Sequence, residues 1–125
     1  MMLKLDMVGI VVKEMKAALD FYRVLGFEIP ETENEALHVE VEQEGIRLAF
    51  DQLSMAKEIF GIWEEPTGHR IELAFLCESK DSLDALYKKV IDHGYGGHRE
   101  PWDAFWGQRY AIVTDPDGNL ISLFV

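Results

Sequence analysis

LDMVGIVV, at residues 5–12, is rich in β-branched side chains and precedes a stretch with apolar residues at helical spacing. β-Branched residues favour strands, and the spacing favours an amphipathic helix over 15–25. Gly26 follows directly and is a natural terminator for that helix. The apolar positions that define the predicted helix are Ala18, Phe21, Tyr22 and Leu25. These residues therefore predict a strand followed by a helix.

The same plan returns in the second half of the chain. RIELAFLCE, at residues 70–78, predicts a strand, and 81–93 predicts a helix that Ser79 or Asp81 can cap and Gly94 can end. The apolar positions of this second helix are Leu83, Leu86, Tyr87 and Val90. Strand-like segments follow each helix, at 28–32, 36–42 and 45–51 in the first half and at 98–102, 108–114 and 120–125 in the second.

Each half therefore has the order strand, helix, strand, strand, strand. This order predicts an α+β fold of two βαβββ modules, each with a mixed sheet that carries its helix on one face. We expect one domain over 1–125, with module one at about 3–53, a short helical connector at 54–68 and module two at about 69–125. Sheets of this kind, placed side by side, would curl into an incomplete barrel that forms a ligand cup.

Alternation along the strands predicts which side chains lie on the open face of each sheet, away from the helix. A hairpin about Gln43-Glu44 would put Glu40 opposite Arg47 on the open face. It would put Val39 opposite Leu48 on the face that packs against the helix. In module two, a turn centred on Pro116-Asp117 would add Arg109 and Ala111 to the open face. The other residues expected on open faces are Met7, Gly9, Val11, His38, Glu42, Ala49, Glu72, Ala74, Leu76, Ser122 and Phe124.

Composition narrows the classes of partner. The net charge of −11, from 23 acidic and 12 basic residues, would repel a phosphate backbone and disfavours nucleic-acid binding. The longest apolar runs, such as Met7–Val12, are too short to cross a bilayer, and the start of the chain does not resemble a signal peptide. Cys77 is the only cysteine, which favours a reducing cytoplasm. Its expected place beneath a helix makes it a core residue rather than a nucleophile.

Several motifs, in this order, resemble the vicinal oxygen chelate superfamily of glyoxalases, bleomycin-resistance proteins and extradiol dioxygenases. The opening motif is residues 5–12, followed by Ala18-Leu19-Asp20-Phe21-Tyr22 and Leu25-Gly26-Phe27. Glu72-Leu73-Ala74-Phe75 resembles the start of the second module, and Asp115-Pro116-Asp117-Gly118-Asn119 with residues 120–123 resembles the closing motif. The resemblance covers nearly the whole chain and lies closest to the bleomycin-resistance branch. It implies paired βαβββ modules and a homodimer with ligand sites in clefts.

In metal-dependent members of that family, the resemblance implies four ligand positions on the open faces. The first is usually His and is Met7 here, and the last is usually Glu and is Ser122 here. The remaining two are Glu72 and either Arg47 or Ala49. A thioether and a guanidinium are poor ligands for divalent ions, and only Glu72 is a credible one. We therefore expect neither a metal nor another cofactor.

Three further stretches stand out. The segment 102–109 holds Trp102, Phe105 and Trp106, followed by Arg109, and could either wall a ligand cleft or pack at a dimer interface. Ile59-Phe60-Gly61-Ile62-Trp63 is a second apolar cluster, suited to a partner subunit or to ligand contact. An acidic tract free of Lys and Arg is either a solvated edge or the mouth of a site for a cation. Its members are Glu31, Glu33, Glu35, Glu40, Glu42 and Glu44.

These observations favour a homodimeric binding protein that sequesters a planar or cationic small molecule without a metal. The expected ligand-binding residues are Met7, Arg47, Glu72, Trp102, Phe105, Trp106, Arg109 and Ser122. Two enzyme hypotheses remain open. One is a glyoxalase- or dioxygenase-like enzyme with an atypical metal site that polarises its substrate. The other is a metal-free enzyme in which Glu72 acts as the general base.

Overall fold

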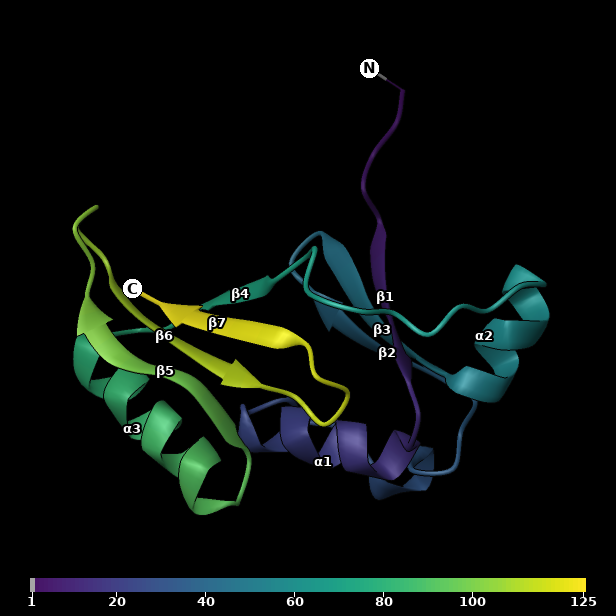
Figure 1. The fold of residues 1–125 in the computed structure, drawn as a ribbon, viewed down its shortest axis with the longest axis horizontal. Coiled ribbons are helices and arrows are strands. Elements are labelled where there is room, and N and C mark those ends of the chain that lie inside the picture. Colours follow the sequence, from purple (N-terminus) through teal and green to yellow (C-terminus); the bar gives the residue numbers. More distant parts are fainter. Residues whose placement is uncertain (1) are drawn as a thin grey trace. The chain divides into compact units, whose positions relative to one another are not determined.

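Each half of the chain builds its own mixed sheet and lays a helix along one face of it (Figure 1). The computed structural model describes residues 2–125, which fall into two units that divide after Pro66: unit 1 is 2–66 and unit 2 is Thr67–Val125. The predicted α+β class, with two mixed sheets and helices, is confirmed. Within residues 2–125, no helix is both long and apolar enough to cross a membrane.

Unit 1 holds a three-stranded sheet in the order β1-β3-β2, with β1 parallel and β2 antiparallel to β3. Its core forms between α1 and one sheet face, where the ring centroids of Tyr22 and Phe50 lie 4.8 Å apart. Gly26, at φ 114°, ends the turn after α1 as the sequence predicts. The elements are β1 Met7–Val12, α1 Met15–Val24, the 3₁₀ helix η1 Glu31–Glu33, β2 His38–Gln43, β3 Ile46–Gln52 and α2 Leu53–Phe60.

The pairing of β2 with β3 is shifted by two residues from the predicted register. Gln43 pairs with Ile46, so the turn is Glu44-Gly45, where Gly45 has φ 78°. Glu40 therefore lies opposite Ala49 rather than Arg47, and the predicted pairing is wrong. A shift of two residues leaves every side chain on its predicted face, because strand side chains alternate with a period of two.

The strand predicted at 28–32 does not form. The chain is extended at Pro30, whose φ and ψ are −59° and 143°, and then enters η1. Pro30 has no N–H for a strand ladder, and Glu31 and Glu33 would be placed close to the acidic β2. β2 is consequently the outermost strand of the unit 1 sheet on that side.

Unit 2 forms a four-stranded sheet in the order β4-β7-β6-β5, with α3 along one face (Figure 1). Leu83 and Val90 of α3 are fully buried, as are Val113 and Leu123 of the sheet. A capping box formed by Ser79 and Ser82 begins the helix, so the predicted cap at Ser79 is confirmed. The elements are β4 Leu73–Leu76, α3 Lys80–Asp92, β5 Gly96–Asp103, β6 Arg109–Thr114 and β7 Leu120–Phe124.

The β6–β7 connection spans five residues, 115–119, rather than a tight turn about Pro116-Asp117. Thr114 pairs with Leu120, and Ala111 pairs with Leu123, which belongs to the face that packs on α3. Ala111 is therefore fully buried on that face, and its predicted place on the open face is wrong. The odd number of connecting residues reverses the faces of β6, so Tyr110 and Ile112 lie on the open face instead.

Candidate functional site

A chain of alternating charges crosses the open face of the unit 1 sheet. Arg47 Nη2 lies 2.5 Å from Asp6 Oδ2, and Arg47 Nη1 lies 2.9 Å from Glu40 Oε2. His38 Nε2 lies 2.8 Å from the same Glu40 oxygen, and His38 Nδ1 lies 2.5 Å from Asp51 Oδ1. The order of charges is therefore acid, base, acid, base, acid, with His38 as the one member whose charge can change near neutral pH.

His38 joins Asp51 to the rest of this network. Both ring nitrogens face carboxylate oxygens, so both hydrogen bonds form only when the ring is doubly protonated. Hydrogen bonds to Asp51 first, and then to Glu40, raise the pKa of His38 above its usual value. Hydrogen bonds from His38 and then Arg47 lower the pKa of Glu40. The open face of unit 1 thus carries cations that carboxylates already neutralise.

Two family ligand positions in unit 1 do not fit a divalent metal. Met7 is the direct neighbour of Arg47 in the β1–β3 pairing. A guanidinium at this position repels a divalent cation, and a thioether is a soft ligand that hard ions bind weakly. Ala49, the alternative position, has no donor and is fully buried. Among residues 2–125, no three His, Cys, Asp or Glu side chains are grouped to hold a metal ion.

Glu72 is anchored on the open face of unit 2 by two hydroxyl groups. Ser122 Oγ donates to Glu72 Oε2 at 2.5 Å, and Tyr110 Oη donates to Glu72 Oε1 at 3.3 Å. Ser122 is fully buried, whereas Glu72 is exposed immediately before β4. The side chain at the last family ligand position therefore fixes a carboxylate rather than contributing one.

Aromatic rings gather around Tyr110 beside this carboxylate. The Tyr110 ring lies 5.5 Å from that of Trp102, 5.6 Å from Trp106 and 6.2 Å from Phe124, measured between centroids. Trp102 pairs with Tyr110 across β5 and β6, and Tyr110 pairs with Phe124 across β6 and β7. The same face of three neighbouring strands thus presents flat apolar rings next to Glu72. We call Glu72, Trp102, Trp106, Tyr110 and Phe124 the aromatic face.

The loop between β5 and β6 extends the aromatic face into solvent. Phe105 is 97% exposed and Trp106 is 49% exposed, and their rings stand edge to face at 5.0 Å. Trp106 is held in place by a hydrogen bond from its indole nitrogen to Gln108, at 2.8 Å. The Arg99 guanidinium lies 3.6 Å from the centre of the Trp102 ring, so this ring already accepts a cation against its face.

Arg109 does not belong to this face, and its predicted place there is wrong. It precedes Tyr110 and Ala111 on β6 and shares the side of Ala111, toward α3. Its Nε and Nη2 reach the two carboxylate oxygens of Asp84 on α3 at 2.8 and 3.1 Å, and its Nη1 reaches Asp103 at 3.1 Å. These partners raise the pKa of Arg109, Asp84 most strongly. Arg109 therefore ties α3 to the sheet.

Some of the predicted site residues belong to unit 1 and the others to unit 2. Trp102, Trp106, Glu72 and Ser122 come together on unit 2, with Phe105 at the rim. Met7 and Arg47 are neighbours on unit 1. Sequence reasoning missed Tyr110, because the predicted turn gave β6 the opposite faces. It also missed Asp51, although strand alternation from Arg47 would have placed it on the open face.

Cys77 follows β4 and is partly buried. Its backbone N–H donates to Phe124 O at 2.8 Å, and burial raises the pKa of the thiol. A raised pKa leaves less thiolate at neutral pH, so Cys77 has the properties of a packing residue rather than a nucleophile.

Two units, each a mixed sheet with a helix on one face and an open opposite face, define the α+β class of this protein. The model of the Glyoxalase/Bleomycin resistance protein/Dioxygenase superfamily matches residues 4–123, and the chain belongs to this superfamily. The predicted family is thereby confirmed. Among curated proteins, none matches the chain.

Solved structures share the fold. A glyoxalase/bleomycin resistance protein/dioxygenase family enzyme from Burkholderia phytofirmans PsJN is 21% identical, with 95% of each chain covered and a TM-score of 0.82. A glyoxalase-related enzyme from Fulvimarina pelagi is 18% identical, with 97% of this chain and 86% of that one covered and a TM-score of 0.84. A superfamily member from Sphaerobacter thermophilus DSM 20745 is 26% identical, with 98% and 97% covered and a TM-score of 0.68.

Proposed function

We propose that this protein binds a planar, cationic small molecule on the aromatic face of unit 2 and sequesters it without a metal. The observation that carries the proposal is the anchored Glu72 carboxylate beside the rings of Trp102, Trp106, Tyr110 and Phe124. A flat cation would stack on the rings and meet the carboxylate with its charge. Each such ring contact is worth about 0.5–2 kcal/mol.

Two features favour a cation over an anion. The chain carries a net charge of −11, which attracts cations from a distance. The hydroxyl groups of Ser122 and Tyr110 already point at Glu72 and hold it as an acceptor on the open face.

The test is a thermal-shift screen with planar aromatic cations and their matched neutral analogues, followed by calorimetry on each hit. Trp102→Ala and Trp106→Ala should each weaken binding roughly tenfold while the domain stays folded. Trp63→Ala, on the connector in unit 1, is the matched control and should bind normally. Normal binding by the Trp102 and Trp106 variants, together with loss of self-association, would assign these rings to a subunit interface and overturn the proposal.

A metal-free enzyme with Glu72 as general base is a second candidate, favoured by the Tyr110 hydroxyl 3.3 Å from its carboxylate. Such a pair could take up and return a proton on one bound substrate. Glu72→Gln keeps the shape of the side chain and removes the base. If turnover of a bound compound is found, loss of turnover with retained binding in this variant supports the enzyme, and unchanged turnover excludes Glu72 as the base.

The single cysteine, Cys77, also supports a cytoplasmic location, which we include in the proposal.

A further inference from the structure

The two units differ at one edge of their sheets. In unit 2, β5 lies outside β6 and pairs with it, whereas among residues 2–66 of unit 1 no strand lies outside β2. The internal repeat makes β2 the counterpart of β6 and segment 28–32 the counterpart of β5. That segment passes through Pro30 into η1 instead of joining the sheet. Unit 1 therefore has a strand edge where its own repeat places a fourth strand.

Hydrogen bonding shows which backbone groups of β2 face outward. Gln52 N donates to Leu37 O at 2.9 Å, and these two residues continue the β2–β3 pairing by one step. In an antiparallel ladder every second pair is hydrogen-bonded, so the backbone groups of Val39 and Val41 point toward β3. Those of 38, 40 and 42 point away from it. Within residues 2–125, no backbone–backbone hydrogen bond reaches β2 from that outer side.

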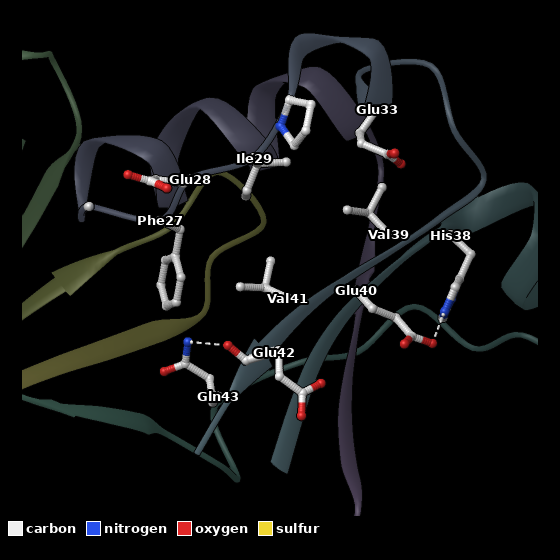
Figure 2. A pocket seen from close by; sticks show the side chains of 12 residues that line it. Phe27, Glu28, Ile29, Glu33, His38, Val39, Glu40, Val41, Glu42 and Gln43 are labelled. Atoms are coloured by element: carbon white, nitrogen blue, oxygen red, sulfur yellow. Dashed lines mark hydrogen bonds and ion pairs between the residues drawn. The ribbon is translucent and has the colours of Figure 1, made fainter. Parts of the chain in front are cut away.

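A groove of about 540 Å³ runs along this edge. Figure 2 shows Phe27 and Ile29 projecting from the segment after α1 into the space beside Val41. The groove includes every residue of β2, from His38 to Gln43, a length of roughly 17–20 Å at the rise of a strand. One side of the groove is thus apolar, and its length is that of an added strand.

The charged side chains around the groove are nearly all acidic. Glu28, Glu33 and Glu42 form no ion pair with any residue of 2–125, and Glu40 is already neutralised by Arg47 and His38. Between Arg23 and Arg47 the chain has seven Glu and no Lys or Arg. A second copy pairing β2 with β2 would bring Glu40 and Glu42 close to their own equivalents, which is unfavourable. Charge therefore argues for a basic occupant rather than another copy of this chain.

We propose that the outer edge of β2 binds an extended, basic peptide segment of a partner protein, which joins the unit 1 sheet as a fourth strand. Backbone groups at 38, 40 and 42 supply the hydrogen bonds. Because strand side chains alternate, one face of the added strand meets Glu42 and its neighbours, and the other meets Phe27 and Ile29. The favoured peptide therefore alternates Lys or Arg with apolar residues. The β2 edge belongs to unit 1 and the aromatic face to unit 2, and the proposal does not depend on the ligand proposed for the aromatic face.

The test uses the full chain and a fluorescently labelled peptide with the alternating sequence Lys-Val-Lys-Val-Lys-Val. We expect saturable binding by fluorescence anisotropy that weakens with added NaCl. Two control peptides distinguish binding as an added strand from attraction by charge alone. A block peptide, Lys-Lys-Lys-Val-Val-Val, keeps the charge but loses the alternation. A peptide N-methylated at alternate residues on the bonding side keeps the side chains but loses the ladder. Each should bind at least about tenfold more weakly.

Glu42→Lys should weaken binding at least about tenfold, because it reverses a charge beside the added strand. Glu58→Lys, on the exposed surface of α2, makes the same charge change away from the groove and should bind like the parent. Circular dichroism checks that both variants are folded. Amide exchange gives a second readout that needs no variant. The N–H groups of 38, 40 and 42 should become protected when the alternating peptide binds.

Several results would overturn the proposal. Equal binding of the block or N-methylated peptide would show attraction by charge alone. Complete displacement of the peptide by equimolar spermine would assign the groove to a small polyamine. Self-association that Glu42→Lys alters would assign the edge to a second copy.

Discussion

His38 is the residue on the open face of unit 1 whose charge responds to ordinary changes of pH. Its pKa is raised by hydrogen bonds to Asp51 and Glu40. The protonated form is therefore favoured by folding, relative to an unfolded value of about 6.5. The network's contribution to stability is complete below that unfolded value, and it is lost as pH rises through the folded pKa.

We predict that NMR titration of the His38 ring gives a midpoint above the usual histidine value. The free energy of unfolding should fall as pH rises through that midpoint, because the ring then loses one of its two donated hydrogen bonds. Asp51→Asn removes the strongest cause and should lower the midpoint. A midpoint at or below the usual value would contradict the network.

Arg109 gives a second prediction at this scale. Because it joins Asp84 on α3 to Asp103 on β5, Arg109→Ala should lower the melting temperature and leave ligand binding on the aromatic face intact. Asp84→Ala should destabilise similarly, and the double variant should lose less than the sum of the two. Weaker binding with an unchanged melting temperature would return Arg109 to the ligand site.

Among the elements, the β6–β7 connection depends on one buried carboxylate. Asp115 is 5% exposed, and Oδ1 accepts from the backbone N–H groups of Asp117 and Asn119, both at 2.9 Å. Its Oδ2 accepts from the Asn119 side chain, also at 2.9 Å. Gly118, at φ 85°, supplies the conformation that such a turn requires.

Asp115→Ala leaves two backbone donors without their acceptor and should lower the free energy of unfolding by about 1–3 kcal/mol. Asp115→Asn keeps one acceptor oxygen and should lower it less. Urea denaturation of the three proteins provides the measurement. Equal stability of the Ala and Asn variants would show that the backbone hydrogen bonds are not the cause.

This connection also shows where sequence reasoning succeeds and fails. Apolar spacing, together with Gly26 and Gly94, predicts α1 and α3 correctly, because these are local signals. The faces of β6 depended on whether the turn held an even or odd number of residues, and D-P-D-G alone does not decide that. The absent strand at 28–32 is a failure of another kind. Both Pro30 and the acidic β2 oppose the pairing of this segment.

In the candidate site too, local signals are predicted from the sequence and long-range pairing is not. Composition and family motifs single out Trp102, Trp106, Glu72 and Ser122 individually as candidate site residues. Tyr110, which joins them, was missed because its face depends on a long-range register rather than on its neighbours in the chain. The face of a β6 residue such as Tyr110 is therefore fixed only by the number of residues in the connection that follows the strand.

At the scale of the whole molecule, we predict that the purified protein holds no stoichiometric zinc, nickel, manganese or iron. The reason is chemical. Met7 stands at one of the family's ligand positions, Arg47 or Ala49 stands at another, and Ser122 binds Glu72 at the last one. Elemental analysis after dialysis, with a known zinc protein as reference, is the measurement. One retained equivalent that Glu72→Ala abolishes would contradict this prediction.

We also predict that the protein forms a homodimer at micromolar concentration. α2 and the residues after it expose an apolar cluster, with Ile59 68%, Phe60 61% and Ile62 78% exposed. The Phe60 and Trp63 rings stack at 6.4 Å and form a flat surface. Burying apolar surface contributes about 25 cal/mol per Å², so a cluster of this kind favours association.

Light scattering of the purified chain should give about twice the mass of one chain, 14.3 kDa. A variant carrying Phe60→Asp and Ile62→Asp should dissociate into folded monomers, because a charge at the centre of an apolar contact is costly to bury. Trp106→Ala, in unit 2, distinguishes the other possible interface. A dimer that resists the first variant and dissociates in the second would move the interface to the aromatic face, and the ligand proposed there would have to bind elsewhere. A parent protein that stays monomeric at these concentrations would exclude both interfaces and leave the connector cluster exposed for another partner.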